Sequence, residues 1–165
     1  MDRLWSPWRS TYVTSATDGD TACIFCDTTE PGRDELILVR GHVSYVVLNL
    51  YPYNSGHLMV VPNRHVPSLQ SLTAEERDEL LRFARDAEVA LNEAYVPQGI
   101  NVGINLGRSA GAGVVDHLHI HLVPRWAGDT NFMSVIGETR VLPEDLSTTK
   151  RRLQPIFQRL SKQSG

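Results

Sequence analysis

Residues 116–126 read DHLHIHLVPRW, and in this stretch polar and apolar side chains alternate with a period of two. Three of the chain's six histidines, His117, His119 and His121, occupy every second position, with leucine or isoleucine between them. Because successive side chains of a β-strand point to opposite faces, the pattern predicts a strand over 117–123. One face of this strand packs in the core and the other carries three imidazoles. The chain must therefore build a sheet around a strand that is apolar on one face only.

The remaining pattern predicts four more strands and two helices. Apolar, β-branched runs bounded by turn residues predict strands over 36–41, 43–50, 57–62 and 100–106. Apolar residues at helical spacing predict a long helix over 73–95, which begins with a capping box of Thr73 and Glu76. A second helix is expected within 143–162, interrupted or kinked at Pro155. Strands joined by short turns, with helices inserted irregularly, indicate an α+β fold with a mainly antiparallel five-stranded sheet.

Length and charge limit the function classes. A chain of 165 residues fits one domain, spanning 1–165, that is large enough to bury a core. The formal net charge of −3 gives no general attraction for nucleic acid or anionic lipid, so neither is expected as a partner. No apolar run is long enough to cross a membrane, and the polar, Trp-rich N-terminus lacks the apolar region of a signal peptide. We expect a cytoplasmic protein.

Three interpretations of the alternating histidines are open at this point. They form the polar face of an exposed strand, or they bind a metal, or they include a nucleophile. A rise of about 3.3 Å per residue places His117 and His121 roughly 13 Å apart on a straight strand. One zinc ion, with Zn–N bonds of about 2.0–2.1 Å, holds two neighbouring histidines in such a strand but hardly three. At least one histidine then needs another role.

A glycine-rich loop, 107-GRSAGAG-113, lies just before the histidines. Alone, such a loop is most often a simple turn. Its backbone N–H groups are also able to form a concave anion site, and Arg108 and Ser109 add side-chain donors. A nucleophilic imidazole facing this loop is suited to attack on phosphorus.

The two cysteines, Cys23 and Cys26, form a Cys-x-x-Cys pair. In the reducing cytosol this spacing indicates a metal site or a redox pair. A redox pair typically opens a helix after a strand, whereas this pair stands between two polar segments. The sequence therefore favours a loop held by a metal.

The motif His117-Leu-His119-Ile-His121-Leu-Val123 resembles the histidine triad (HIT) pattern, His-φ-His-φ-His-φ-φ, where φ is apolar. The stretch VVLNLYPYNSGHLMVVPNRHV is similar to the family's first strand pair, and the resemblance covers about residues 20–126. The segments LWSPWR, NVGINLGRSAGAG and VPRWAGDTNFM resemble a bacterial branch close to diadenosine tetraphosphate phosphorylases. The resemblance implies a HIT fold, usually dimeric, with a C-terminal helical extension.

The resemblance also implies a role for each site residue. His119 is the expected nucleophile that takes AMP from an α-phosphate, with a backbone carbonyl near His117 holding its far ring nitrogen. His121 is expected to contact the phosphate or the bridging oxygen, Asn49 the ribose, and Trp126 the substrate. The expected phosphate path comprises Asn105, Gly107, Arg108, Ser109, Gly111, Ala112 and Gly113. An inorganic phosphate acceptor would give ADP and water would give AMP, so both a phosphorylase and a dinucleoside polyphosphate or phosphoramidate hydrolase fit.

Two further expectations follow from the resemblance. Four residues, Cys23, Cys26, His65 and His117, match a structural zinc site of some bacterial HIT proteins, and Cys₂His₂ is a closed four-ligand set. No organic cofactor is expected. Gly113 stands where the family commonly has a polar residue, so any side-chain donor must come from Arg108 or Ser109.

Two other function classes also fit the residues. A zinc hydrolase would hold an open, water-activating metal between two triad histidines. A non-catalytic nucleotide-binding or zinc-stabilised module would have no turnover at all. For His57, at the start of a predicted strand, a structural hydrogen bond is at least as well supported as a substrate contact.

Overall fold

The structure is a computed structural model, and it describes residues 23–26, 34–114, 116–129 and 144–163. The LWSPWR segment of the N-terminus lies outside the described residues, as do residues 130–133 of the VPRWAGDTNFM segment.

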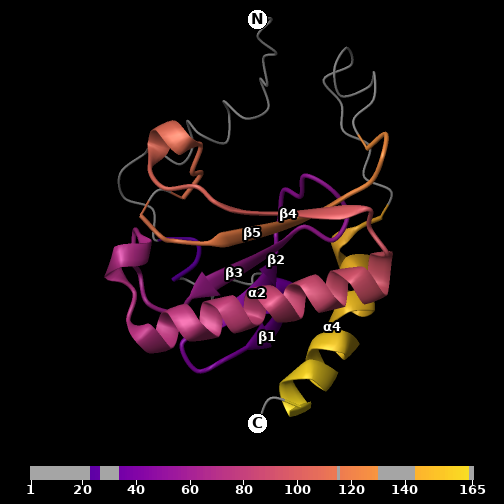
Figure 1. Ribbon diagram of the computed structural model, residues 1–165, viewed down its shortest axis with the longest axis horizontal. Coiled ribbons are helices and arrows are strands. Elements are labelled where there is room, and N and C mark those ends of the chain that lie inside the picture. Colours follow the sequence, from indigo (N-terminus) through magenta and orange to yellow (C-terminus); the bar gives the residue numbers. More distant parts are fainter. Residues whose placement is uncertain (1–22, 27–33, 115, 130–143, 164–165) are drawn as a thin grey trace, which may run out of the picture.

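Five strands form one antiparallel sheet, as the sequence predicts (Figure 1). The strands are β1 (Ile37–Arg40), β2 (Ser44–Leu48), β3 (Leu58–Pro62), β4 (Gly99–Ile104) and β5 (Ile120–Arg125). Their order across the sheet is β1-β2-β3-β5-β4, so the last two strands exchange places relative to the chain order. Three short 3₁₀ helices, η1 (Asp34–Leu36), η2 (Leu69–Ser71) and η3 (Arg108–Ala110), lie in the connections.

The strand register separates two apolar layers. Val46 of β2 pairs with Val60 of β3, and both belong to the larger core, which the sheet shares with its two helices. The alternate pair, Val47 with Met59, belongs to a smaller cluster with Phe25 on the opposite face. His121 lies directly opposite Met59 in the register, and it therefore belongs to the face away from the helices.

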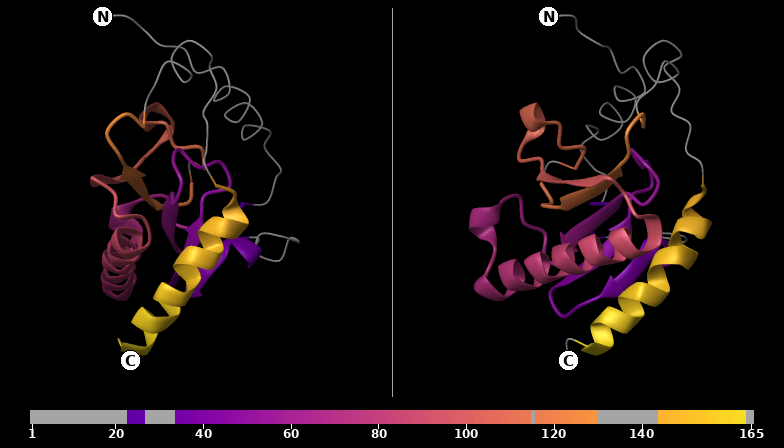
Figure 2. Two further views of the ribbon diagram at one scale, coloured as in Figure 1. Left: turned by 90° about the vertical axis from the view of Figure 1, so that its right-hand side faces the viewer. Right: turned by 45° about the vertical axis from the view of Figure 1, so that its right-hand side comes forward.

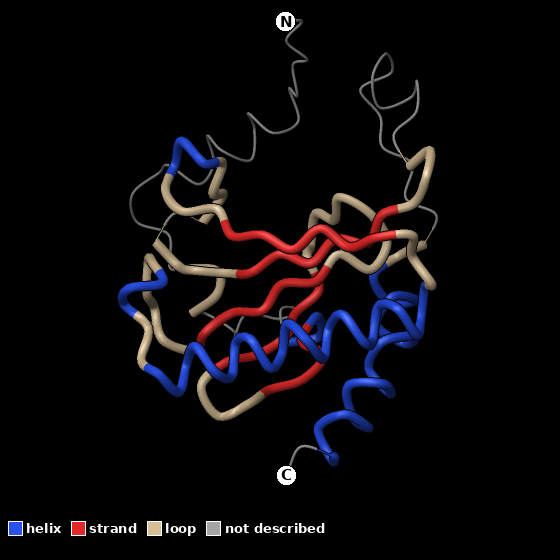
Figure 3. The backbone as a smooth tube through the Cα atoms, in the orientation of Figure 1, coloured by secondary structure: helices blue, strands red, loops and turns tan. Residues whose placement is uncertain are grey.

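The long helix α2 (Ala74–Tyr95) begins as predicted. The Thr73 hydroxyl accepts a hydrogen bond from the Glu76 backbone N–H at 3.2 Å, and the Glu76 carboxylate accepts one from the Thr73 N–H at 2.8 Å. The helix runs across one face of the sheet (Figure 3). Its buried side includes Leu80, Phe83 and Leu91.

The C-terminal helix α4 (Leu146–Gln163) passes without interruption through Pro155, which lies on its exposed side. There, water can satisfy the backbone carbonyl that loses its N–H partner. Leu153 and Phe157 bury their side chains in the core shared with α2. Helix α4 packs against α2 and β1 (Figure 2). Within the described part of the chain, neither helix combines the length and apolar character that crossing a membrane requires.

The histidine strand begins later than predicted. The sequence places it at 117–123, whereas β5 starts at Ile120 and continues to Arg125. The pairing of β3 with β5 ends at Val60 and Ile120, and the N–H of Leu118 donates to the carbonyl oxygen of Val66 at 2.7 Å. His117 and His119 therefore precede the strand and need not share the face of His121.

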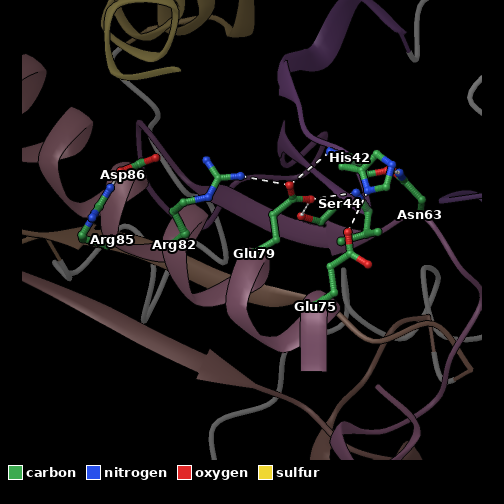
Figure 4. A network of polar contacts seen from close by, with 9 residues as sticks. His42, Ser44, Asn63, Glu75, Glu79, Arg82, Arg85 and Asp86 are labelled. Atoms are coloured by element: carbon green, nitrogen blue, oxygen red, sulfur yellow. Dashed lines mark hydrogen bonds and ion pairs between the residues drawn. The ribbon is translucent and has the colours of Figure 1, made fainter. Parts of the chain in front are cut away.

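Helix α2 is tied to the β1–β2 turn by the carboxylate of Glu79 (Figure 4). It accepts hydrogen bonds from the His42 N–H at 3.1 Å, the Val43 N–H at 2.8 Å and the Ser44 hydroxyl at 2.7 Å. Burial raises the pKa of this carboxyl, but those hydrogen bonds outweigh burial and leave the pKa below its usual value. The ionised Glu79 thus provides hydrogen-bond acceptors for two N–H groups of the turn and for the hydroxyl of Ser44, which is buried.

Candidate functional site

The three triad histidines sit in different surroundings. His117 and His119 are 1% and 4% exposed, whereas His121 is half-buried. The rings of His119 and His121 lie 4.7 Å apart, nearly perpendicular, and Phe25 packs 5.0 Å from the His119 ring. The residues are close enough to act on one substrate, but each has its own hydrogen-bond partner.

The ring of His117 is oriented for metal binding. Its Nε2 lies 2.9 Å from the carbonyl oxygen of Pro62, which can only accept, so Nε2 carries the proton. Nδ1 then keeps its lone pair, and it points at two sulfurs, 3.3 Å from Cys23 and 3.5 Å from Cys26. A hydrogen bond to the far nitrogen is the usual support of a metal-binding imidazole.

Cys23, Cys26, His65 and His117 gather their ligand atoms within 4.8 Å of one another. Among the described residues no other such group forms. The Nδ1 of His65 lies 3.2 Å from the Cys26 sulfur. Zn–S bonds of about 2.3 Å and Zn–N bonds of about 2.0–2.1 Å at tetrahedral angles would separate S and N by about 3.5 Å. The four predicted ligands thus come together at a spacing that fits a tetrahedral ion.

The two thiols of this cluster differ in acidity. Burial raises the pKa of Cys23, but a hydrogen bond with His117, which donates only when Nδ1 is protonated as well as Nε2, and backbone hydrogen bonds from Phe25 and Cys26 outweigh burial and lower the pKa to about 6. Burial and the adjacent Cys23 raise the pKa of Cys26 to about 11. A bound cation in place of the Nδ1 proton would favour the thiolate form of both cysteines.

His119 presents a lone pair on its far nitrogen. Its Nδ1 lies 2.8 Å from the carbonyl oxygen of His117, so Nδ1 carries the proton and Nε2 is unprotonated in the neutral ring. Burial lowers the pKa of His119, partly offset by this hydrogen bond, and keeps the imidazole neutral at pH 7. A neutral imidazole with a free Nε2 is a competent nucleophile.

A fourth histidine fixes the tautomer of His121. The Tyr53 N–H donates to Nδ1 of His57 at 3.1 Å, so the proton of His57 is on Nε2. That Nε2 lies 3.0 Å from Nδ1 of His121 and donates to it, which leaves the His121 proton on Nε2. His57 is 1% exposed. His57 thus makes the kind of structural hydrogen bond that the sequence suggested for it. Its partner, His121, lies 64 residues further along the chain, and no local pattern in the sequence links the two.

Asn49 lies beside the same histidine. Its amide nitrogen is 3.3 Å from Nδ1 of His57, and its amide oxygen accepts from the Tyr51 N–H at 2.9 Å. Asn49 directly follows β2 and is half-buried. The structure thus brings the predicted ribose contact next to the His57–His121 pair.

Two N–H groups of the glycine-rich loop have partners inside the loop, and the phosphate path stays a prediction. The N–H groups of Ala110 and Gly111 donate to carbonyl oxygens of Gly107 and Arg108, so they are used within η3. Gly107 and Gly111 have φ of 79° and 86°, values that favour glycine. The side chains of Arg108 and Ser109 are exposed, Ala112 is buried and Gly113 is half-buried.

The structure places the last two predicted substrate residues, Asn105 and Trp126, in different surroundings. Asn105 lines a pocket of about 340 Å³ together with His121. The ring of Trp126 instead lies 6.4 Å from that of Tyr95 and packs edge-on against it. Its substrate contact stays a prediction.

A family model described as the HIT domain matches residues 32–128, which include His57, Asn49 and all three triad histidines. The chain belongs to the HIT domain family. A HIT relative, the AP-4-A phosphorylase of Mycobacterium tuberculosis, is 44% identical over 161 residues, covering 93% of this chain and 83% of that protein.

Solved HIT structures share the fold. A hypothetical histidine triad nucleotide-binding protein of Sulfolobus tokodaii matches 84% of this chain and 93% of its own, with 24% identity and a TM-score of 0.67. A Zn-bound histidine triad family protein of Mycobacterium smegmatis matches 92% of this chain and 95% of its own, with 22% identity and a TM-score of 0.62. These similarities confirm the predicted α+β HIT fold.

Proposed function

We propose that the protein is a HIT enzyme that transfers a nucleotidyl group from a dinucleoside polyphosphate, most simply diadenosine tetraphosphate, to inorganic phosphate. The observation that carries this proposal is the hydrogen bond between His119 Nδ1 and the His117 carbonyl oxygen, which leaves Nε2 of His119 as a nucleophile. The 44% identity to an AP-4-A phosphorylase over most of both chains supports the substrate class.

In the first half-reaction, the Nε2 lone pair of His119 attacks the α-phosphorus. A P–N bond forms and the bond to the bridging oxygen breaks, so that ATP leaves. The His117 carbonyl accepts from Nδ1–H and stabilises the positive charge that develops on the ring. The Nε2–H of His121, set by His57, donates to the bridging oxygen or a phosphate oxygen.

In the second half-reaction, an oxygen of inorganic phosphate attacks the adenylyl phosphorus and the P–N bond breaks. ADP leaves and His119 recovers its lone pair. Water in the same position would give AMP instead. We retain hydrolysis as the second candidate, since Gly113 supplies no side-chain donor to hold a phosphate acceptor.

Zinc bound by Cys23, Cys26, His65 and His117 would have a structural role in this enzyme. The set is closed, with four protein ligands, whereas a metal that activates water needs an open position. Nδ1 of His121 accepts from His57 and Nε2 of His121 carries the proton, which speaks against an open zinc shared by His119 and His121. Zinc would join the Cys-x-x-Cys segment to the residue whose carbonyl orients the nucleophile.

We also propose a cytoplasmic homodimer in which β4 meets its counterpart. β4 ends the sheet and pairs only with β5 within the described part of the chain. Val102 of β4 is 58% exposed, and Leu81 and Val89 expose one side of α2. A bare edge beside apolar side chains is typical of a contact surface. Sedimentation that yields a monomer at micromolar concentration would contradict this proposal.

The deciding experiment incubates the purified protein with diadenosine tetraphosphate, with and without phosphate, and separates the products by chromatography. We expect ADP plus ATP, formed only with phosphate. If AMP plus ATP form without phosphate, the protein is a hydrolase and the proposed phosphorolysis is wrong.

Two variants test the nucleophile. His119→Ala should lower kcat by at least about 10⁴-fold and abolish acid-labile labelling of the protein by substrate carrying ³²P at the α-phosphate. His42→Ala, an exposed histidine on the β1–β2 turn, is the matched control and should keep full activity. Full turnover by the His119 variant would contradict the proposal.

A further inference from the structure

The pocket beside His121 has a wall that the proposed chemistry does not use. It lies over β4 and β5, and its polar lining includes Asn54, Asn101, Asn105, Arg125 and Asp129. Tyr53, Val102 and Val123 add ring and apolar surface. Its volume of about 340 Å³ is near the lower end of small-molecule sites, which span roughly 300–1,000 Å³.

A bidentate ion pair holds this wall rigid. Arg125 donates to Asp129 through Nε at 2.5 Å and through a terminal nitrogen at 2.8 Å. The other terminal nitrogen donates to the Asn101 amide oxygen at 3.1 Å. Asn54 donates to both Asp129 at 2.8 Å and the Pro124 carbonyl oxygen at 3.0 Å. Three separate chain segments thus converge on one fixed arrangement.

The charge of this wall is close to zero. The guanidinium of Arg125 is matched by Asp129, whose side chain is only 11% exposed. Hydrogen bonds from Arg125 hold the pKa of Asp129 well below its usual range, so the carboxylate is ionised throughout the neutral range. An anion such as inorganic phosphate would meet Asp129 as well as Arg125. The wall suits an uncharged group that exchanges several hydrogen bonds, and the carboxamides of Asn101 and Asn105 offer both donors and acceptors.

The residues that line the pocket indicate which part of the substrate would lie in it. Asn49, the proposed ribose contact, and His119, the proposed nucleophile, are not among the described residues that line the pocket. His121 of β5 lines the pocket and is the proposed donor to the bridging oxygen. The part of the substrate beyond that oxygen therefore leaves on the pocket side.

We propose that the wall formed by Asn54, Asn101, Arg125 and Asp129 is the subsite for the second nucleoside of a dinucleoside polyphosphate, the one that departs with the leaving nucleotide. This inference rests on the proposed function and adds a reason for a dinucleoside substrate. Ribose hydroxyls and base edges are uncharged and hydrogen-bonding, and the apolar surface of Tyr53 and Val123 suits a planar base.

The test compares diadenosine tetraphosphate with adenosine 5′-tetraphosphate, which has the same phosphate chain but no second nucleoside. Asn101→Trp should fill the pocket, and the exposed strand position accepts an aromatic residue. We expect KM for the dinucleoside to rise about tenfold, equivalent to the loss of one or two hydrogen bonds, while KM for adenosine tetraphosphate changes less than about twofold. Asn101→Ala should give a smaller change in the same direction.

Gln158→Trp, which replaces an exposed amide on α4, is the matched control and should change neither constant. Sedimentation of each variant checks that the oligomeric state is kept. Equal effects on both substrates, or none, would overturn the subsite. A rise only in KM for phosphate would overturn it in favour of an acceptor site. If wild-type protein cleaves neither substrate, the proposed function fails, whereas cleavage of both with unaltered selectivity in Asn101→Trp refutes the subsite alone.

Discussion

The carbonyl oxygen of His117 lies 2.8 Å from Nδ1 of His119, while the side chain of His117 points its own Nδ1 at Cys23 and Cys26. One residue therefore contacts the candidate metal cluster through its ring and the candidate nucleophile through its backbone. A single residue thus links the candidate metal cluster to the candidate nucleophile, and we expect an ion that holds the His117 ring also to steady its carbonyl.

The first prediction follows from this link and concerns the loss of zinc. Cys23→Ser should lose bound zinc, measured by plasma emission spectroscopy. At free zinc about a hundredfold above the Kd of the wild-type site, its free energy of unfolding should fall by on the order of 3 kcal/mol. We expect kcat to fall about tenfold or more, because the His117 carbonyl is less firmly held. The adenylyl–His119 species should still form slowly. Undiminished zinc in this variant would contradict the ligand set, and complete loss of adenylylation on chelation would favour an open catalytic zinc.

The tautomer of His121 gives a second prediction. His57→Phe keeps an aromatic ring at this position but removes the N–H that His57 donates to His121. His121 can then place its proton on either nitrogen, and we expect kcat to fall about tenfold to hundredfold with little change in KM. Steady-state kinetics with diadenosine tetraphosphate measure this. The control His42→Phe makes the same change at an exposed histidine of the β1–β2 turn and should retain activity. Full activity of His57→Phe would show that His121 needs no such support.

How far the sequence predicts this site can be judged from the same residues. The alternation of 117–123 correctly predicts an apolar and a polar side, but the sequence does not show that His117 and His119 precede the strand. That start depends on the Leu118–Val66 hydrogen bond, which joins distant segments. The four predicted metal ligands are brought together. The His57–His121 contact escapes prediction because the pairing of distant strands brings the two residues together and no short motif encodes it. Arg125 and Asp129 are only four residues apart, but their contacts to Asn101 and Asn54 join distant segments and escape prediction for the same reason.

Glu76 links the metal-binding segment to helix α2 and makes stability depend on pH. Its carboxylate accepts from Arg64, the neighbour of His65, at 2.9 and 2.7 Å. The Arg64 hydrogen bonds, opposed by burial and helped by the Thr73 N–H, lower the pKa of Glu76 from 4.5 to about 2. A carboxyl whose folded pKa is depressed adds stability above the unfolded pKa and loses it as pH falls toward the folded one.

We therefore expect Glu76→Gln to lower the free energy of unfolding by about 2 kcal/mol at pH 7, after allowance for solvent around Arg64. The difference from wild type should shrink by more than half between pH 5 and pH 3. Urea unfolding followed by circular dichroism at both pH values checks this. Glu75→Gln, at an exposed carboxylate that pairs with His42, should change stability by less than about 0.5 kcal/mol at pH 7. An unfolding difference for Glu76→Gln that stays constant with pH would refute the linkage.

Gly41 tests the contact between α2 and the β1–β2 turn sterically. A Cβ at this position would lie 2.6 Å from the Glu79 carboxylate, closer than side-chain carbons approach. Gly41→Ala must displace Glu79 from the N–H of Val43 and the hydroxyl of Ser44, which is fully buried. We expect a loss of about 2 kcal/mol in the free energy of unfolding.

The matched control for Gly41→Ala is Gly99→Ala, at the start of β4, where a Cβ would meet no atom within 4 Å. It should be neutral or slightly stabilising. In a double-mutant cycle, Gly41→Ala should cost less than about 0.5 kcal/mol once Glu79→Ala has removed the carboxylate, because the clash and the hydrogen bonds are then already absent. Equal costs of Gly41→Ala in both backgrounds would show that the strain arises in the turn itself and not from Glu79.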